Sequence, residues 1–466
     1  MPEGSRKRTR RGSRVARVVS IGALLSIVAT SVEAQTEGAR PERPFRPLFG
    51  DPRGATRSLV FSADLAVAYD DNVLADQGTG STAPTSPLVT DPRYQQSGVY
   101  NALNTSLAYS HRARRVSLTA AGGSAFRYYP DLTGFTAIHH TASADVSGML
   151  GSRTTVRASQ QISLAPAYQL ILFPAVTPAQ GFGALETSFV DPVVTNPDLS
   201  VYARRGFISS SSAALSQELS SRSSVSAYYD LTRAEFSGRE LDLRRRTAGV
   251  RFSRGLSRHA SLRIGYAHME GSYGFGGQDR LSGHNIDAGV DYNRALSFSR
   301  RTTLGFAVGS NAVSNGEQTR YDVTGHATLN HHIGRSWTAF AAYRRGMWFE
   351  DGFPEPIFSD SVTLGLGGYL SRRLEFRSQA GYSTGSVGFG SAGNGFDTYM
   401  GTARLQYGLT RYLATYVEYL YFHYEFSTAT LLPGAFPRGL DRQGVRGGVS
   451  LWVPLYAGGR GERVTR

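Results

Sequence analysis

Hydrophobic and polar residues alternate with a period of two along most of this chain. Residues 250–266 show the pattern well, because two alternating runs flank a short polar corner at residues 256–259. In the second run Leu262, Ile264 and Tyr266 fall on one face of an extended strand, since successive side chains of a strand point to opposite faces. The residues between them are polar or small, so the segment predicts a β-hairpin with one apolar face.

Corners of the same kind recur along the chain, and longer loops rich in Gly, Asp and Pro lie between one pair of arms and the next. Short turns and long loops that alternate in this way are typical of up-and-down antiparallel β-barrels of outer membranes. The corners fall at residues 111–114, 150–153, 219–222, 256–258, 298–301, 333–335, 370–373 and 409–411.

Two arms for each corner, with one strand before the first corner and one after the last, give about eighteen strands. An even number places both ends of the chain on the side of the short turns, as in bacterial barrels. The alternation is cleanest at residues 285–293, 321–330, 374–383 and 398–409. We therefore expect an all-β protein, a single transmembrane barrel of the outer-membrane type. It should be closed, because an open sheet edge in lipid would leave backbone groups unpaired.

Bulk composition alone would suggest a soluble protein, because 40% of the residues are hydrophobic and the mean hydropathy is −0.26. A barrel strand faces lipid with every second side chain only, which halves its apolar signal relative to a membrane helix. After the leader the sequence contains no apolar run of about 18 residues, which argues against helical membrane spans.

The N-terminal segment has the features of a secretory signal peptide. A basic stretch at residues 6–17 precedes a short apolar stretch at 18–29, and small residues up to Ala34 form a cleavage site. The adjacent Arg10 and Arg11 raise a twin-arginine alternative, but a barrel precursor has to cross the inner membrane unfolded, so general secretion is expected. We expect a leader at residues 1–34, a periplasmic tail at 35–57, the barrel at 58–455 and a periplasmic C-terminal tail at 456–466.

The formal net charge of +14 comes in part from the leader, and the other arginines are spread over turns and strand faces. No basic patch with interleaved aromatic residues is present, which argues against nucleic-acid binding. The chain has no cysteine, so disulfides and cysteine metal sites are excluded. The expected partners are outer-membrane lipid and the barrel assembly machinery, and no cofactor is expected.

Two short segments resemble outer-membrane sequences. The last predicted strand, residues 446–453, is similar to the C-terminal assembly signal of outer-membrane barrels, although the chain continues beyond it. The end of the first strand, which reads Tyr69, Asp70, Asp71 and Asn72, resembles the beta-barrel porin-2 group of outer-membrane proteins. Some members of that group are encoded beside exopolysaccharide genes, so the resemblance implies an outer-membrane barrel and leaves a link to polysaccharide open.

Aromatic residues near the predicted strand ends are typical of the girdles that place barrels at the two membrane interfaces. The alternative is a path of aromatic rings in the lumen on which sugars stack, and Trp452, predicted to face inward, favours it. The predicted girdle residues are Tyr128, Tyr129, Trp337, Tyr343, Trp348, Tyr412, Tyr421 and Tyr424.

The spacing of polar residues indicates neither a metal site nor a catalytic site. The acidic run at residues 70–76 carries oxygens that hard cations prefer, but a calcium site would need more ligands at fixed spacing. Two adjacent histidine pairs, at residues 139–140 and 331–332, lie on predicted strands, where neighbouring side chains point to opposite faces and cannot share one ion. No nucleophile, base and acid stand out together, so we do not expect an enzyme.

Charged residues on the predicted inner faces are the candidate pore lining. Such charges cost little in a water-filled lumen, whereas at mid-bilayer on the lipid face they cost about 2 to 4 kcal/mol. Both signs occur, so no strong ion preference is expected. The candidate lining residues are Asp64, Arg157, Arg263, Asp287, Asp291, Asp322, Glu375, Arg377, Arg404, Glu418 and Arg446.

The longest loop, residues 168–203, includes an apolar run at residues 170–176. A solvated external loop has no reason to carry such a run, and long loops in compact folds are usually functional or disordered. We therefore expect this loop to fold inward and narrow the pore; the alternative is a loop that lies across the outer rim. Folding inward would bring Glu186, Asp191 and Asp198 near the arginines of the lumen.

The sequence therefore favours a monomeric channel of the outer membrane, with passive diffusion of small polar solutes through a polar lumen. One alternative is a barrel for the export or anchoring of exopolysaccharide or another surface polymer. A second alternative is a barrel enzyme that acts on envelope lipids, which would need a clustered catalytic trio. A further alternative is a soluble β-sandwich, which would be rejected if extraction of the protein needs detergent.

Overall fold

The computed structural model places the described part of the chain in strands and turns. The described residues are 55–72, 97–130, 135–165, 168–169, 200–202, 206–236, 242–257, 259–273, 279–296, 299–314, 318–348, 353, 355–389, 394–430, 432 and 438–460. They contain no helix long and apolar enough to cross a membrane. The predicted leader, most of the predicted N-terminal tail, and Glu186, Asp191 and Asp198 lie outside the described residues.

Long strands dominate the described residues, as the period of two predicts. Those of the wall run from 12 residues in β5 to 22 in β20, more than the roughly 9 to 11 residues that a tilted strand needs to cross a bilayer. The strands are β1 (Ala55–Asp70), β2 (Gly98–Arg112), β3 (Val116–Tyr129), β4 (Phe135–Met149), β5 (Thr154–Ala165), β6 (Tyr168–Gln169), β7 (Ser200–Tyr202), β8 (Gly206–Ser220), β9 (Ser223–Phe236), β10 (Leu243–Gly255), β11 (Ala260–Tyr273), β12 (Asp279–Leu296), β13 (Ser299–Ser314), β14 (Thr319–Ile333), β15 (Trp337–Trp348), β16 (Ile357–Tyr369), β17 (Leu374–Val387), β18 (Gly395–Gly408), β19 (Leu413–Phe426) and β20 (Gly439–Arg460).

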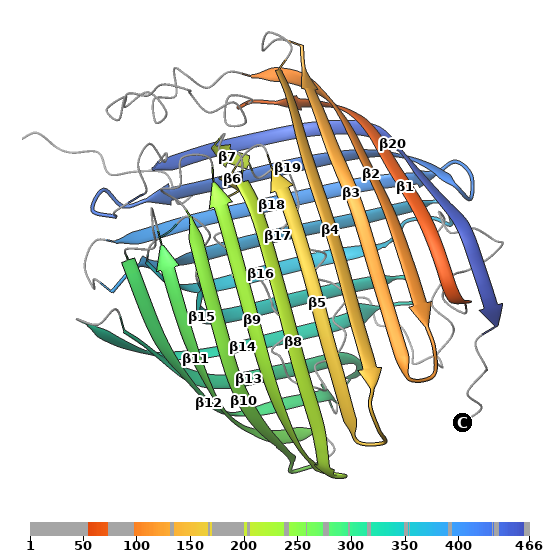
Figure 1. Cartoon of the computed structure of the whole chain (residues 1–466). Helices are drawn as coiled ribbons and strands as arrows, with labels where there is room; N and C mark the ends of the chain where they lie inside the picture. The colour runs from red at the N-terminus through yellow and green to blue at the C-terminus, as the bar shows by residue number, and fades with distance from the viewer. Residues whose placement is uncertain are drawn as a thin grey trace, which may run out of the picture. The chain divides into compact units, whose positions relative to one another are not determined.

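The wall is one closed antiparallel sheet of 18 strands, so the predicted fold class is confirmed. Each strand pairs with the next along the chain, β5 pairs with β8, and β20 pairs with β1. Figure 1 shows β1 and β20, the two ends of the colour range, side by side in the wall. Every predicted corner joins two neighbouring strands. The first strand begins at Ala55 and the last ends at Arg460, so the wall exceeds the expected range 58–455 at both ends.

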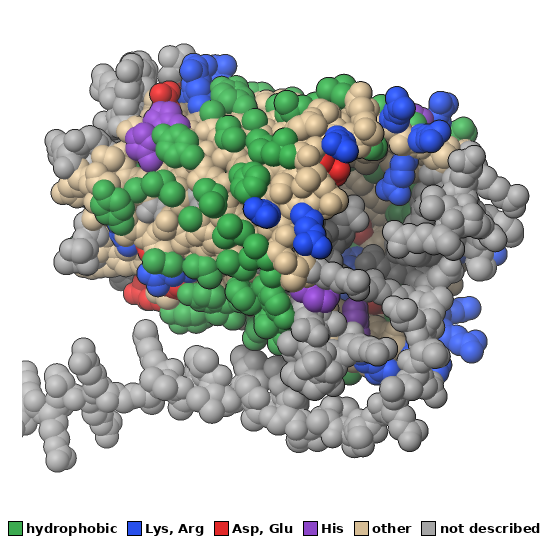
Figure 2. Space-filling view, turned by 90° about the horizontal axis from the view of Figure 1, so that it is seen from below, with side chains coloured by type: hydrophobic (Ala, Val, Ile, Leu, Met, Phe, Trp, Pro, Cys, Tyr) green, Lys and Arg blue, Asp and Glu red, His purple; other side chains and the backbone are tan. Residues whose placement is uncertain are grey.

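Side chains of the wall alternate between its outer and inner faces. On β1, Leu65 and Val67 are 60% and 56% exposed, whereas Ala66 and Ala68 between and after them are 3% exposed. The same alternation puts apolar side chains on the outer face of the other strands, and Figure 2 shows them in green across the flank that it views. A closed wall with an apolar outer face meets the requirement for contact with lipid.

The residues predicted for an aromatic girdle do not all lie on the outer face of the wall. Tyr128 and Tyr343 are 40% and 42% exposed on the outer face. Tyr129 and Tyr424 are fully buried on the inner face, because successive residues of a strand point to opposite sides. Trp348 packs against the same interior cluster as Tyr424. These three residues therefore belong to the inside of the barrel and not to a girdle.

Apolar side chains at the loop-side ends of the strands form a buried cluster on the inner face, which we call the apolar collar. Phe353, from the loop after β15, is part of it, and Phe389 and Leu432, from the loops after β17 and β19, pack against it. The ring of Phe353 lies 5.9 Å from that of Phe426 between centroids. Side chains therefore occupy the loop-side interior along much of the wall. The collar residues on strands are Ala234, Phe236, Leu243, Val313, Ile357, Val387, Phe396, Met400, Phe422, Tyr424, Phe426 and Leu440.

The acidic run at the end of β1 joins the first strand to the last at the loop side. Arg442 Nε and Nη2 lie 2.8 and 2.5 Å from Asp70 Oδ2, and both side chains are buried. The backbone N–H of Asn72 donates to Asp70 Oδ1 at 2.9 Å, and that of Gln443 donates to Asp71 Oδ1 at 2.7 Å. Burial raises the pKa of the Asp71 carboxyl, which lies just beyond the strand. Asp70 and Asp71 thus tie the end of β1 to β20.

Candidate functional site

Four charged side chains stand in one row across the inner faces of β17 to β20. The strand ladders pair Arg377 with Arg404, Arg404 with Glu418, and Glu418 with Arg446. Residues paired in an antiparallel ladder share one face of the sheet. Alternation along each strand placed these residues on the inner face, and the ladder registers brought them to the same level of the wall.

Glu418 is held between two arginines of this row. Arg446 donates from Nε and Nη2 to Glu418 Oε2 at 3.0 and 2.9 Å. Arg404 Nη1 lies 3.6 Å from the same oxygen, and the Glu418 side chain is 11% exposed. Charge-assisted hydrogen bonds are roughly twice as strong as neutral ones. The carboxylate is therefore fixed to the wall and can leave it only by losing both partners.

Arg404 carries the contacts across the closing seam of the barrel. Its Nη2 donates to Ser450 Oγ on β20 at 3.1 Å and lies 3.8 Å from Asp64 Oδ1 on β1. The hydroxyl of Ser450 also bonds to Asp64. The guanidinium carbon lies 3.8 Å from the centre of the Tyr416 ring, a cation–π contact that orients it. Side chains of β18, β19, β20 and β1 thus form one connected network.

Arg377 extends the network to β17 and is its most exposed arginine. Its side chain is 45% exposed, against 27% for Arg404. Arg377 Nε donates to Glu375 Oε1 on the same strand at 2.7 Å. Like charges directly opposite in a ladder repel each other, and Glu375 and Glu418 offset the repulsion between the two arginines. We call these residues the seam network, whose formal charges cancel: Asp64, Glu375, Arg377, Arg404, Glu418 and Arg446.

The other candidate lining residues lie elsewhere on the wall. Arg157 on β5 and Arg263 on β11 occupy inner-face positions near the turns, and Arg263 is 7% exposed. The ladder of β11 with β12 puts Asp287 and Asp291 on the same face as Arg263. The side chains of these two aspartates lie outside the described part of the structure. These four residues make no part of the seam network.

Asp322 lies at a break in the wall. The ladder between β14 and β15 ends at the pair Gly325 and Arg345, so the described loop-side residues of β14 have no ladder partner on β15. Arg345 bridges the gap, because its Nε donates to the carbonyl of Val323 at 3.2 Å and its Nη2 lies 3.3 Å from Asp322 Oδ1. Arg345 also pairs with Asp360 of β16 at 3.4 Å. Asp322 is therefore tied to the rim of the wall.

The inner face from β1 to β8 carries a second polar feature, which the sequence interpretation missed. Serine hydroxyls on neighbouring strands bond to one another across the ladders, and we call these strands the hydroxyl sector. The signal was present in the sequence as serines at alternate positions, but their pairing depends on register. The bonded pairs are Ser58 with Ser110 and Ser62 with Ser106, each at 2.6 Å, Ser117 with Ser147 at 2.7 Å, and Ser159 with Ser212 at 2.5 Å.

Two large inner-face rings lie flat along the wall instead of reaching into the interior. Tyr228 stands opposite Gly249, and Phe340 stands opposite Gly365. A Cβ atom at Gly249 would lie 2.5 Å from the Tyr228 ring, and one at Gly365 would lie 2.0 Å from the Phe340 ring. Only glycine leaves room for these rings, so the two pairs keep bulky side chains out of the interior.

The two adjacent histidines of β4 each bond to a serine. His139 Nε2 lies 3.0 Å from Ser163 Oγ, and His140 Nδ1 lies 2.8 Å from Ser124 Oγ. The adjacent histidines point to opposite faces, as their position on one strand requires. In the described part of the chain neither imidazole has a carboxylate within hydrogen-bonding distance, so these pairs lack the third group of a catalytic triad. The described part of the chain contains no group of three or more His, Cys, Asp or Glu side chains that could hold a metal ion.

No protein-family model matches the sequence, and no curated protein matches it. Solved structures show a distant likeness. OccK2 (OpdF) of Pseudomonas aeruginosa, solved in complex with glucuronate, is 9% identical, with a TM-score of 0.44 over 87% of this chain and 100% of that chain. OpdO of the same organism is 12% identical, with a TM-score of 0.41 over 86% and 98%. OccAB4 of Acinetobacter baumannii is 10% identical, with a TM-score of 0.41 over 87% and 100%.

Proposed function

We propose that this chain is a channel of the bacterial outer membrane through which small polar solutes pass by diffusion. The observation that carries the proposal is the closed 18-stranded wall with apolar side chains outside and charged or hydroxyl side chains inside. In lipid only helices and closed barrels satisfy their backbone groups. A polar inner face serves no purpose in an apolar medium, whereas it suits a water-filled passage.

Three features of the inner face support a selective passage. The apolar collar narrows the interior at the loop side, and the seam network presents fixed charges of both signs nearer the turns. The hydroxyl sector lines the strands from β1 to β8 with uncharged hydroxyl groups, beside the charged Asp64 and Arg157. Neutral hydroxylated solutes and solutes that carry both charges suit these surfaces better than a simple ion does, because the formal charges of the seam network cancel.

The long loop after β5 belongs to this proposal as a constriction. Its described base is the two-stranded sheet of β6 and β7, in which Tyr168 pairs with Tyr202. The apolar collar shows that other loops of this barrel send apolar residues inward, as Phe353 does. An inward fold of residues 170–199 would put Glu186, Asp191 and Asp198 within reach of lumen arginines.

A barrel for polysaccharide export is the second candidate, and inner-face aromatic residues favour it. Tyr100 and Tyr129 lie 5.1 Å apart between ring centroids, and Arg127 lies 5.1 Å from the Tyr100 ring. These residues are at most 4% exposed, however, so their rings are covered and offer no stacking surface to a sugar. The channel therefore accounts better for the inner face.

Conductance of the refolded barrel in planar bilayers tests the channel. We expect discrete conductance steps and weak ion preference in the unchanged protein. Glu418→Gln leaves Arg404 and Arg446 without their shared counter-charge, so the permeability ratio should shift severalfold toward anions. Asp441→Asn, on the outer face, is the matched control and should leave the reversal potential unchanged. A folded, heat-modifiable barrel without conductance, or a Glu418→Gln variant with unchanged selectivity, would overturn the proposal.

A further inference from the structure

Basic side chains gather on the outer face of the wall at the loop-side ends of β9 to β12. The ladders put Arg233 of β9 opposite Arg244 of β10, and His268 of β11 opposite His284 of β12. Arg246 lies two residues from Arg244 on β10 and therefore on the same face. We call these five residues the basic rim, which the registers of four strands assemble.

An apolar row lies directly beside the basic rim, on the side of the turns. Val250, Tyr266 and Ile286 pair across β10, β11 and β12, and they are 54%, 50% and 52% exposed on the outer face. A charged side chain on the lipid face costs most at mid-bilayer and little near the interface, and a tyrosine suits the headgroup level. The boundary between the apolar row and the basic rim therefore marks the headgroup level of the leaflet around the loops.

The positive charge of the basic rim is only partly neutralised by the described residues. Glu235 forms an ion pair with Arg233, and Glu270 Oε1 lies 3.4 Å from His268 Nε2. Neither of the two arginines that β10 contributes has a carboxylate of a described residue within ion-pair distance, and both are exposed. Arg233 and the arginine opposite it on β10 repel each other, as like charges directly opposite in a ladder do. An anion bound between them would remove this repulsion.

Other parts of the loop-side outer face carry acidic side chains instead. Asp397 of β18 stands opposite Glu425 of β19, and both are exposed, as is Asp441 of β20. Arg345 of β15 is an outer-face arginine, but it lies 3.4 Å from a carboxylate oxygen of Asp360. Among the described residues, the excess of positive charge at this level of the outer face is therefore concentrated on β9 to β12.

The two histidines add hydrogen-bonding groups beside the arginines of the basic rim. The rings of His268 and His284 lie 5.0 Å apart between centroids. Tyr266 Oη lies 2.7 Å from His284 Nδ1, a contact that orients the imidazole and joins it to the apolar row. The site thus combines basic groups with an adjacent apolar surface, and an anion that also carries hydrocarbon chains matches both parts.

We propose that the basic rim binds the phosphate-bearing headgroup of a lipid from the leaflet around the loops. Arg244 and Arg246 donate to the phosphate oxygens, since the planar guanidinium fits phosphate with paired hydrogen bonds. Arg233 and the two histidines lie beside them, and the acyl chains run along the apolar row. A soluble phosphate would use the basic rim alone and gain nothing from the apolar row. The proposal rests on the placement of the barrel in the outer membrane, with its long loops outside.

Native mass spectrometry of the folded barrel in detergent micelles tests this site. The probes are lipid A, which carries phosphates on a sugar headgroup, and the same lipid after removal of its phosphates, at equal mole fraction. We expect the unchanged protein to retain about tenfold more of the phosphorylated lipid. Arg244→Gln with Arg246→Gln should lower that retention about tenfold, and the matching double lysine variant should fall between the two, because it keeps the charge and loses the planar fork.

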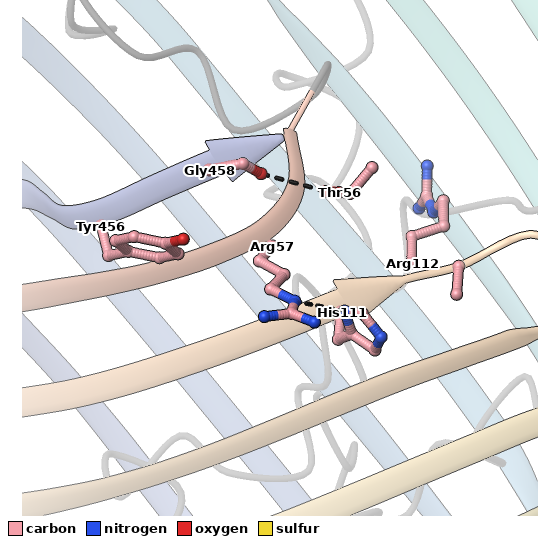
Figure 3. A pocket seen from close by; sticks show the side chains of 7 residues that line it. Thr56, Arg57, His111, Arg112, Tyr456 and Gly458 are labelled. Atoms are coloured by element: carbon pink, nitrogen blue, oxygen red, sulfur yellow. Dashed lines mark hydrogen bonds between the residues drawn. The ribbon is translucent and has the colours of Figure 1, made fainter. Parts of the chain in front are cut away.

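Two outer-face arginines at the turn side of the wall provide the matched control. Figure 3 shows one of them, Arg57 on β1, whose Nε donates to His111 Nδ1 at 3.3 Å. The other, Arg254, is exposed near the turn-side end of β10. Arg57→Gln with Arg254→Gln removes the same charge at the other end of the barrel, so retention should stay unchanged.

Equal retention of the two lipids by the unchanged protein would overturn the role of the phosphate, and this comparison needs no variant. Equal loss in the control pair, or full retention in the double glutamine variant of β10, would overturn the site. Displacement of the lipid by an equal concentration of inorganic phosphate would show a soluble-anion site and overturn the lipid. The measurement needs only a folded barrel, shown by heat-modifiable migration, so a failure of conduction leaves its outcome unaffected.

Discussion

At the scale of single residues, two of the charge systems in the described wall have different tasks. Arg442 and Asp70 form a pair that is almost fully buried at the closing seam. The arginines and carboxylates of the seam network remain partly exposed toward the interior. A buried pair is strongly destabilised when one partner is removed, because the other charge stays buried without compensation. Asp70 with Arg442 therefore holds the wall closed, whereas the seam network is available to solutes.

Arg442→Gln should destabilise the folded barrel by about 3 to 5 kcal/mol, since it leaves Asp70 charged and buried. Unfolding of the refolded protein in urea, followed by electrophoretic mobility and tryptophan fluorescence, measures the loss. Adding Asp70→Asn should restore much of the stability, because two amides can share a hydrogen bond. Asp441→Asn, next to Arg442 but exposed, is the control. Equal stability of Arg442→Gln and this control would exclude the proposed role of the pair.

At the scale of the element, each strand presents lipid and interior at alternate residues. On β17, Ala380 is exposed on the outer face and pairs with Leu364, which is 47% exposed. Its neighbour Gln379 is on the inner face, opposite Gly365. The same face also includes Ser383, which is fully buried, so inner-face positions near the loop side have no space for a larger side chain. The mid-strand pair gives the cleaner comparison.

Arginine at Ala380 should destabilise the barrel in a bilayer by about 2 to 4 kcal/mol, the cost of this side chain at mid-membrane on the lipid face. Arginine at Gln379 should be tolerated, because its side chain can reach the polar interior. Folding yield into lipid vesicles and the urea midpoint of each variant provide the measurement. Comparable loss at both positions would reject the observed orientation of β17.

At the scale of the whole molecule, the passage is set by what fills the ends of the barrel. The strands alone would leave a wide interior, because 18 strands form a ring large enough for an aqueous channel. The apolar collar, with Phe353, Phe389 and Leu432 from three loops, occupies part of its loop side. The 18-stranded wall therefore encloses the passage, and the residues from the loops determine how wide it is.

Deletion of residues 177–196 from the long loop should raise single-channel conductance and shift ion preference, because it removes Glu186 and Asp191. The deletion leaves the paired segments β6 and β7 in place. Heat-modifiable migration has to show first that the shortened protein folds. A deletion of residues 390–393, in the short loop after β17, is a control for loop shortening in general. Unchanged conductance after the deletion of residues 177–196 would contradict the constriction and would indicate that the loop lies across the outer rim.

The sequence by itself determined the strands, their two faces, the turns and the closed ring. The alternation and the turns are local properties, because the alternation has a period of two and each corner joins two adjacent strands. The closed ring follows from the number of strands, since an even number of antiparallel strands can close into a barrel without a free sheet edge. Because the alternation is local, the sequence placed Arg377, Arg404, Glu418 and Arg446 on the inner face one by one. It placed Tyr129 in a girdle wrongly, because aromatic content at a strand end does not reveal which face the ring occupies.

Only the tertiary structure decided which residues meet. The seam network depends on the registers of five strands, and a shift of one residue in any of them would turn its side chains to the other face. Asp70 and Arg442 are 372 residues apart, and the closure of the barrel brings them together. The collar depends on loops that send Phe353 inward. Such contacts join segments far apart in the chain, and a period of two contains no information about them.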